Sequence, residues 1–478
     1  MPQYKEEPID RNQVIMSVLE QEIEEDNIVR FLDAYVESLD MEEHGFTHAI
    51  LADTGRRPMP PKAMMKLYLY GYLYNLRSSR ALARGCKINR EVQWLVCGLT
   101  PSYKTIAEFR RNNLEQVEAI FLGVVQFADS LNLYSKELLA VDGVKIRANN
   151  SGHKFDTKKK TEKKIAYFKG KITAYLEEME KLDREEEQAV EGQTKEQLNA
   201  KLEKAYEKLE ELKRLEGDLP DSGGVAHTDP DSRNMRMNNK GFGMCHNVQA
   251  VADSKHKLVA AYDVVDAGTD VEQLGVMAKK SREGLLKETE NEVTMLAEKG
   301  YYSGEQITAC LEEGIVPIVA VKETSVTMET GYDIDDFGYD EEKDVLICSQ
   351  GKELQRHGEK DIRYYNKEAC SNCKNREKCT QNKKGVRRIK VNGGKEILIL
   401  RSAKKRYREN REIYRKRQEI IEQIFGNIKR QMGFEYFLLR GFPKVKAEAA
   451  LIFTAYNMKR VWNIMKGKGL LDSIKSYA

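Results

Sequence analysis

The stretch "EVTMLAEKGYYSGEQITACLEEG", residues 292–314, contains the change of pattern that decides the fold. Residues 292–296 are a short apolar run that predicts a buried strand, and residues 303–314 predict a helix. Glu298 lies between them, at the expected C-terminal end of the strand. Open α/β sheets place their chemistry at this end of their strands. The stretch therefore predicts a sheet with an acidic side chain at its functional edge.

A second acid follows the apolar run in "ELLAVDGVKIRANN", residues 137–150. Asp142 ends that run, and Gly143 permits a turn or a close approach of another segment. Further along the chain, the patterns predict a β-hairpin and then a helix, over residues 245–253, 257–265 and 270–286. The order of these elements predicts a mixed α/β core, over residues 131–156 and 220–320, that is interrupted by an insertion.

The insertion, residues 157–219, has the heptad pattern of two paired helices. The first apolar stripe begins at Ile165 and the second at Leu198, with a break at Gly192 and a capping-box pattern at Thr194 and Gln197. We expect an antiparallel helical hairpin with solvated charged faces. A role in partner binding or self-association is the alternative.

Residues 1–130 predict short helices joined by tight turns. The helix expected near residues 100–113 has Ser102 or Thr105 as its cap, and we expect Arg110 and Arg111 to be exposed. A helix-turn-helix-like DNA-binding domain fits this pattern, and so does a plain helical bundle.

Residues 321–400 are rich in turns and contain four cysteines. Thiolates are zinc ligands, and a structural zinc site needs four ligands in tetrahedral geometry. The spacing C-x2-C-x5-C is not that of a standard finger, so structural zinc and reduced thiols both remain open. The four residues are Cys348, Cys370, Cys373 and Cys379.

The last segment, residues 401–478, begins with a predicted long helix over residues 401–434. Its first part, residues 401–417, is strongly basic, and such a stripe attracts a phosphate backbone, although a solvated helix face is the usual explanation of a charge run. Glu422 follows between apolar residues. The final helix is mostly apolar and is expected to lie in the core.

Three acids now stand out: Asp142 and Glu298 after strands, and Glu422 on a helix. A ribonuclease-H-like core brings two strand-end acids and one helix acid together. Two Mg²⁺ ions about 3.5–4 Å apart, held by such carboxylates, activate a water or 3′-hydroxyl and stabilise the leaving oxygen of a phosphodiester. Mg²⁺ prefers hard oxygen ligands of this kind.

The composition excludes little beyond a membrane protein. The chain has 478 residues and a net charge of +3, and no apolar run approaches the roughly 18 residues that span a bilayer. The start lacks the apolar core of a signal peptide. We therefore expect a cytoplasmic protein without membrane association, whose eight cysteines are mostly reduced thiols.

Several motifs together resemble those of bacterial insertion-sequence transposases of the DDE type. They include "RPMPPKAMMKLYLYGYLYNLRSSRALARGC", "TPSYKTIAEFRR", "VDGVKIRANNS", "HTDPDSRNMR", "HNVQAVADSKHKLV", "EKGYYS" and the C-x2-C-x5-C spacing. The C-terminal "IEQIFGNIKRQMGFEYFLLRGFPKVKAEAALIFTAYNMKR" continues the resemblance. It covers nearly the whole chain.

The resemblance implies catalytic, metal-binding roles for Asp142, Glu298 and Glu422. Glu298 stands where the family has its second aspartate, in a motif usually written Asp-x-Gly-Tyr. Glu448 is the rival for the third acid. A related group has the signature Tyr-x2-Arg-x3-Glu-x6-Lys, which Tyr414, Arg417, Glu422 and Lys429 approximate. One extra residue before Glu422 rotates Arg417 by about 100° around the helix.

The resemblance also implies DNA as the partner, both the transposon ends and a target. Arg110, Arg111, Arg233, Tyr414, Arg417 and Lys429 are the candidate DNA contacts. For Asp229 and Asp231 in "HTDPDSR", turn hydrogen bonds are the favoured explanation. Mg²⁺, or Mn²⁺ in its place, is the implied cofactor, and the structural Zn²⁺ is a further candidate.

We therefore expect a nucleoid-associated bacterial enzyme that binds terminal inverted repeats, cleaves DNA and transfers strands as a homodimer or higher assembly. Two alternatives remain. One is a catalytically impaired or repurposed DNA-binding copy, because Glu298 replaces aspartate. The other is a related metal-dependent nuclease without strand transfer.

Overall fold

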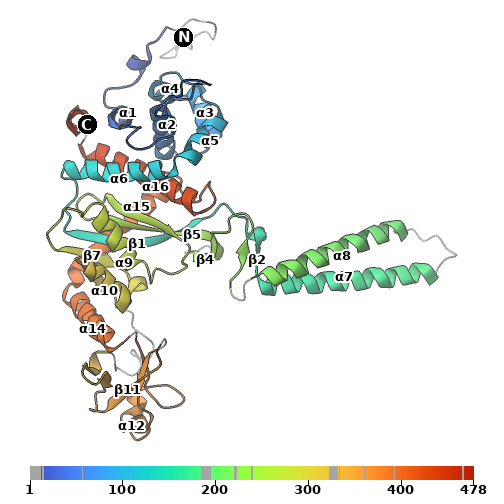
Figure 1. Ribbon diagram of the computed structural model, residues 1–478, viewed down its shortest axis with the longest axis vertical. Helices are drawn as coiled ribbons and strands as arrows, with labels where there is room; N and C mark the ends of the chain where they lie inside the picture. The colour runs from blue at the N-terminus through green and yellow to red at the C-terminus, as the bar shows by residue number, and fades with distance from the viewer. Residues whose placement is uncertain are drawn as a thin grey trace, which may run out of the picture.

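The computed structural model describes residues 12, 16–55, 57–184, 195–219, 223–237, 241–321, 332, 334–359, 362–391, 393–465 and 468–477. The mixed α/β fold class that the sequence predicts is confirmed: helices surround a six-stranded sheet, and two smaller sheets lie outside it (Figure 1). Within the described residues no helix has the length and apolar character of a membrane span.

The N-terminal part is helical, and polar caps explain where several helices begin. Asn27, Ser78, Asn89 and Ser102 each accept a hydrogen bond from the first turn of the helix that follows, and Pro61 opens another helix. Ser102, rather than Thr105, is the cap in its helix. The elements are η1 (Leu19–Glu22), α1 (Ile28–Ser38), α2 (Pro61–Leu73), α3 (Ser79–Ile88), α4 (Arg90–Leu95), α5 (Tyr103–Asn112) and α6 (Leu114–Ser130).

The central sheet has the strand order β6–β5–β1–β7–β8, and β4 pairs with the other end of β5. β5 is antiparallel to β1, whereas β1, β7 and β8 are parallel. The apolar runs that precede Asp142 and Glu298 thus become neighbouring strands. The expectation that Asp142 follows the end of its strand is wrong, because pairing with β5 continues β1 to Arg147. The strands are β1 (Leu138–Arg147), β4 (Arg233–Met237), β5 (Gly241–Asp253), β6 (Val259–Val265), β7 (Val293–Ala297) and β8 (Ile315–Val319).

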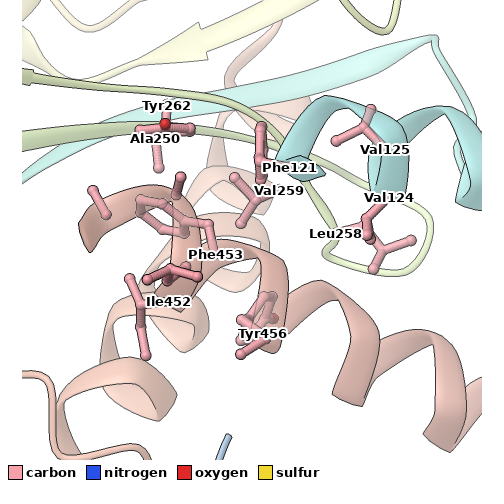
Figure 2. Close-up of a cluster of buried hydrophobic side chains, with 14 of the residues drawn as sticks. Phe121, Val124, Val125, Ala250, Leu258, Val259, Tyr262, Ile452, Phe453 and Tyr456 are labelled. Atoms are coloured by element: carbon pink, nitrogen blue, oxygen red, sulfur yellow. The ribbon is translucent and has the colours of Figure 1, made fainter. Parts of the chain in front are cut away.

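Helices cover the sheet and close the main core. α15 (Arg411–Arg430) packs on β1, β5 and β7, and α16 (Phe442–Met465) packs on β6 and against α2 and α6. Figure 2 shows part of this core, where Phe453 of α16 meets Phe121 of α6 and Tyr262 of β6. α9 (Leu274–Glu283) packs on β5 and β6, and α10 (Gly304–Glu312) packs on α9 and β8. Two short turns, η2 (Gly152–Lys154) and η3 (Lys299–Tyr301), follow β1 and β7.

Residues 157–184 and 195–219 form an arm that projects from the side of the sheet (Figure 1). The arm consists of α7 (Lys158–Arg184) and α8 (Lys195–Asp218), rooted on the paired strands β2 (Phe155–Asp156) and β3 (Val225–Ala226). Its interior contains the apolar side chains Ile165, Ile172, Ala205, Leu209 and Leu212. The predicted break at Gly192 and cap at Thr194 lie outside the described residues.

The cysteine-containing segment forms a separate small sheet with the order β13–β12–β11–β10–β9 and its own core around Phe337, Leu346 and Tyr364. Its elements are η4 (Ile334–Asp336), β9 (Gly338–Asp340), β10 (Val345–Ile347), β11 (Glu353–His357), β12 (Arg363–Tyr365), α12 (Lys367–Ser371), α13 (Arg376–Cys379) and β13 (Ile389–Lys390).

The prediction of one long helix over residues 401–434 is wrong. Two helices, α14 (Gly394–Glu409) and α15, meet at Asn410, whose backbone leaves the helical conformation at φ −115° and ψ 32°. The Asn410 side chain donates a hydrogen bond to the carbonyl of Arg406 and so ends α14. The break lets α15 turn onto the sheet. The chain then continues through α16 to α17 (Lys468–Tyr477).

Candidate functional site

Asp142 and Glu298 lie on neighbouring parallel strands. Asp142 is on β1, where it pairs with Ala250 of β5, and Glu298 directly follows the last residue of β7. Because Ala140 pairs with Leu296, the two acids lie next to each other toward the C-terminal end of β7, the side of the sheet that we call its functional edge. The Glu298 carboxylate is close enough to help raise the pKa of Asp142. The sheet thus brings together two of the three predicted acids.

α15 places Arg417 and Glu422 beside Asp142. Arg417 Nη1 lies 3.1 Å from Asp142 Oδ2, and Arg417 Nη2 lies 3.7 Å from Glu422 Oε1. The Arg417 side chain is buried, whereas that of Glu422 is about half exposed. Arg417 Nε has no hydrogen-bond partner among the described residues. A guanidinium therefore stands between the first and third predicted acids.

Burial controls the charge of Asp142. Burial raises the pKa of Asp142 to about 6, Arg417 opposes this rise, and the nearby Glu298 carboxylate adds to it. The Asp142 carboxylate also accepts a hydrogen bond of 2.8 Å from the Gly143 amide. Two carboxylates that are held together with little water need a positive charge, and the Arg417 guanidinium provides one.

The sequence did not single out a fourth acid, Asp270, which lies beside Glu298. Asp270 Oδ1 accepts hydrogen bonds from Asn247 at 2.7 Å and from Gln249 at 2.6 Å, and Lys145 Nζ lies 3.3 Å away. The one available signal was the Thr-Asp pair, residues 269 and 270, at the start of the helix expected at 270–286.

Gly143 and Tyr301 complete this wall of the site. A Cβ atom at Gly143 would lie 2.3 Å from Gln249 Nε2 and 2.6 Å from Asp270 Oδ1, so this close approach requires glycine. The buried Tyr301 hydroxyl donates to Gln249 Oε1. Burial raises the pKa of Tyr301 well above its ordinary value, and the carboxylates of Asp270, Asp142 and Glu298 add to the rise.

A groove of about 250 Å³ opens at this edge and mixes acidic with basic side chains. Asp270 and Glu298 line it together with four cations, and one of the cations is the predicted Lys429 on α15. Such a lining suits a phosphate group that approaches carboxylates. The lining residues are Gly143, Val144, Lys145, Arg147, Arg236, Met237, Asp270, Glu298, Lys429 and Glu435.

Glu448, the rival third acid, makes different contacts. It is fully buried on α16, accepts hydrogen bonds from the amides of Leu438 and Leu439, and pairs with Arg77 at 3.5 Å. Arg110 adds a second nearby positive charge. These contacts join the N-terminal helices to α16 and account for both oxygens of the carboxylate.

The expectation that Arg110 is exposed is wrong. Its guanidinium lies 5.2 Å from the centre of the Tyr68 ring and 3.5 Å from the Tyr72 hydroxyl, so aromatic packing and the nearby Glu448 bury the side chain. Arg111 is exposed, and it pairs with Glu108 at 2.9 Å.

A second groove, of about 740 Å³, runs between α3 and α5. Arg110 and Arg111 line it together with Arg80, Lys104 and Lys444.

The remaining predicted contacts lie elsewhere. Tyr414 is half-buried on α15 and packs against Tyr407 with ring centres 5.0 Å apart. Arg233 is exposed and pairs with Asp266 at 3.0 Å. Asp229 accepts hydrogen bonds from His246 and from the Gly441 amide, and Asp231 accepts one from the Phe442 amide, so both acids hold the start of α16.

Neither the acids nor the cysteines form a metal-binding group as the described side chains lie. Among the described residues, no three His, Cys, Asp or Glu side chains lie close enough to hold an ion as they are placed. Cys348, Cys370, Cys373 and Cys379 do line one cavity of about 40 Å³. Burial raises the pKa of Cys379, and the other three thiols add to that rise.

Comparison with protein families gives two matches. Residues 17–112 match the transposase domain DUF772, and residues 342–462 match the transposase DDE domain. The second match contains Glu422, while Asp142 and Glu298 lie outside both. No curated protein and no solved structure matches the chain. Both matches are to transposase domains, and together they indicate a DDE transposase of an insertion sequence.

Proposed function

We propose that this transposase binds the terminal inverted repeats of its element, cleaves DNA at the element ends and joins the 3′-ends to a target. The observation that carries this proposal is the meeting of Asp142 and Glu298 at one sheet edge, beside Arg417 and Glu422 of α15. The mixed acidic and basic groove at the same edge supports it.

The strand order supports a ribonuclease-H-like catalytic core. The neighbouring strands β1, β5 and β6 form an antiparallel set. β7 and β8 add in parallel on the other side of β1. We assign this core to residues 131–156 and 220–320, completed by helices of 401–478. The helical domain is 1–130, and the two insertions are 157–219 and 321–400.

The donor chemistry fits a divalent cation, because Asp142, Glu298 and Glu422 offer the hard carboxylate oxygens that Mg²⁺ prefers, although Arg417 must first give up its contacts with Asp142 and Glu422. Asp142, Glu298 and Glu422 would hold Mg²⁺ or Mn²⁺, and the ions would supply the Lewis acid for phosphodiester cleavage. Lys145, Arg147 and Lys429 bind the phosphates that enter the groove. The Gln249 amide donates a hydrogen bond to Asp270 and accepts one from the Tyr301 hydroxyl, so Asp270 orients Gln249 and, through it, Tyr301.

The second groove, between α3 and α5, is the candidate site for recognising the repeat. Its cations Arg80, Lys104 and Arg111 come from two neighbouring short helices, an arrangement that suits contacts with DNA phosphates. Arg110 supports the groove from within rather than from the surface. Two DNA ends must meet for transposition, so we assign a homodimer or higher assembly on bacterial chromosomal DNA.

A second candidate function is DNA binding without cleavage. The Arg417–Asp142 ion pair favours it, because the guanidinium neutralises the first acid and a metal would have to compete with it. A nuclease without strand transfer would share the same site.

The test is a cleavage assay with duplex DNA that carries the element end, with Mg²⁺ or Mn²⁺. We expect wild-type protein to nick at the end and to form strand-transfer products. Asp142→Asn and Glu298→Gln should abolish both, while Glu419→Gln, an exposed change on α15, should not. Binding without nicking by wild-type protein would establish the second candidate instead. Nicking without joined products would establish the nuclease.

A further inference from the structure

The first half of α7 carries a concentration of positive charge that the fold does not explain. Residues 158–171 contain seven lysines against one glutamate, whereas residues 172–184 contain four acidic and two basic residues. The charge is therefore confined to the part of the arm next to the sheet.

Five of the seven lysines share one side of the helix. At 3.6 residues per turn, Lys159, Lys160, Lys163, Lys164 and Lys171 fall within an arc of about 140°, next to the face that packs on α8. We call these five residues the lysine stripe. Tyr167 lies within the same arc, 58% exposed, and Lys171 Nζ lies 5.0 Å from the centre of its ring.

This placement works against the stability of the helix itself. The first turn of α7 has lysines and no acid, although the N-terminus of a helix favours negative charge. Lys159 and Lys163 repel each other at i and i+4, as do Lys160 and Lys164. Asp156 relieves part of this repulsion, because Lys164 binds it at 2.6 Å and Lys160 lies 3.6 Å away.

The partner helix shows what an ordinary solvated face looks like. On α8, Lys208 pairs with Glu211 at 2.5 Å and Lys213 pairs with Glu210 at 2.7 Å. Acids and bases alternate there and neutralise one another. Exposure to solvent therefore explains the charges of α8. Within the described part of the chain, the lysine stripe on α7 has no negative charge of similar size to balance it.

The root of the arm lies close to the groove of about 250 Å³ that Asp270 and Glu298 line, which we call the carboxylate groove. β2 and β3 begin and end the arm, and the Thr228 amide donates to Asn150 in the segment that follows β1. A groove of about 580 Å³ lined by Asn149, Asn150, Phe242 and Tyr436 continues from there. It shares Arg147 with the carboxylate groove, so one path leads from the acids toward α7.

We propose that the lysine stripe of α7 binds the phosphate backbone of duplex DNA that continues from the carboxylate groove. This inference rests on the proposed function, because it takes the DNA in the groove as given. The step from Lys159 to Lys171 covers about 18 Å of helix. That length spans about five phosphates of one strand, which are 3.4 Å apart along the duplex axis.

The test compares three full-length proteins. The first is wild type, the second is Lys159→Gln/Lys163→Gln/Lys171→Gln, and the third is the matched control Lys204→Gln/Lys208→Gln/Lys213→Gln on α8. Each variant removes three lysine charges from the same arm. Affinity for end-containing duplex DNA is measured by fluorescence anisotropy over a range of KCl concentrations. One duplex stops near the cleavage site, and the other extends about ten base pairs further.

We expect the α7 variant to bind the long duplex at least tenfold more weakly than wild type near 0.1 M salt. The slope of log K against log salt is negative, and its magnitude should fall by about 0.9 for each phosphate that the variant no longer neutralises. The short duplex and the α8 control should behave like wild type. The corresponding triple change to arginine should restore binding, because arginine keeps the charge.

Equal slopes for the α7 variant and the α8 control would overturn the inference, even if the wild-type protein cuts DNA normally. Loss of binding to a duplex RNA of the same length, but not to DNA, would also overturn it. Conversely, stripe-dependent DNA binding by a wild-type protein that never cuts would support the stripe and contradict the cleavage proposal.

Discussion

Arg417 Nη1 lies 3.1 Å from Asp142 Oδ2, so a guanidinium from α15 neutralises the acid on β1 before any metal is involved. Burial and the nearby Glu298 carboxylate keep the pKa of Asp142 at about 6 in spite of this pair. The site therefore concentrates negative charge that the fold stabilises only in part. Functional sites often retain such local instability, because the charge is needed for chemistry.

This balance predicts how stability depends on pH in metal-free protein. The pKa of Asp142 rises from its ordinary 3.8 to about 6, so the folded state keeps a proton between these pH values that the unfolded state has lost. The contribution of Asp142 to the free energy of unfolding should therefore fall as pH rises from about 4 to 6 and stay lower above that range. Asp142→Asn cannot ionise, so its loss of stability over that range should be smaller.

The measurement is urea unfolding in a chelating buffer at pH 5 and at pH 7.5. At pH 7.5 the variant should be more stable than wild type, by on the order of 2 kcal/mol, since one pKa unit corresponds to about 1.4 kcal/mol. At pH 5 the difference should shrink. A variant that is equally or less stable at pH 7.5 would contradict the electrostatic account of the site.

Mutation of Glu448 should lower stability, whereas mutation of Glu422 should lower the rate of DNA cleavage. Glu448→Gln should lower the free energy of unfolding by about 3 kcal/mol or more, because it leaves Arg77 and Arg110 buried without their counter-charge. Glu422→Gln should leave stability within about 0.5 kcal/mol, because the side chain is half exposed. Its cleavage should fall at least a hundredfold. Normal cleavage by Glu422→Gln, with a well-folded but inactive Glu448→Gln, would make Glu448 the third acid instead.

The two acids could be predicted because short apolar runs locate buried strands, but only Glu298 ends its strand, since β1 continues past Asp142 to Arg147. Asp142 and Glu298 follow such runs, and neighbouring parallel strands bring them together. Asp270 escaped because the sequence placed it at the start of the helix expected over 270–286, whereas α9 begins only at Leu274 and Asp270 lies in the loop before it. The role of Glu448 depends on Arg77, which is 371 residues away in the sequence, and no local pattern reports such a contact. The helix break at Asn410 depends on a side-chain hydrogen bond that competes with the helix.

The cysteine cavity predicts a bound structural metal. We expect about one zinc per chain in protein purified under reducing conditions, because four thiols line one small cavity. Cys373→Ser should reduce the zinc content and destabilise the small sheet. Cys97→Ser, at an exposed cysteine far from the cavity in sequence, should do neither. Metal analysis that finds no zinc with four free thiols would remove the site.

Glu298 offers the most direct test of the activity of this copy. The family motif has aspartate at this position, and glutamate extends the carboxylate by one methylene. A displacement of about 1 Å in such a site can cost on the order of 10²-fold in rate. Here, however, the Glu298 carboxylate lies beside Gly300, where an added Cβ would come within 3.1 Å of Glu298 Oε1. We expect Glu298→Asp to preserve or raise cleavage of end-containing DNA in Mg²⁺, and Glu298→Gln to abolish it, measured under single-turnover conditions. If Glu298→Asp instead loses cleavage at least tenfold while its fold and DNA affinity match wild type, the site is built for glutamate.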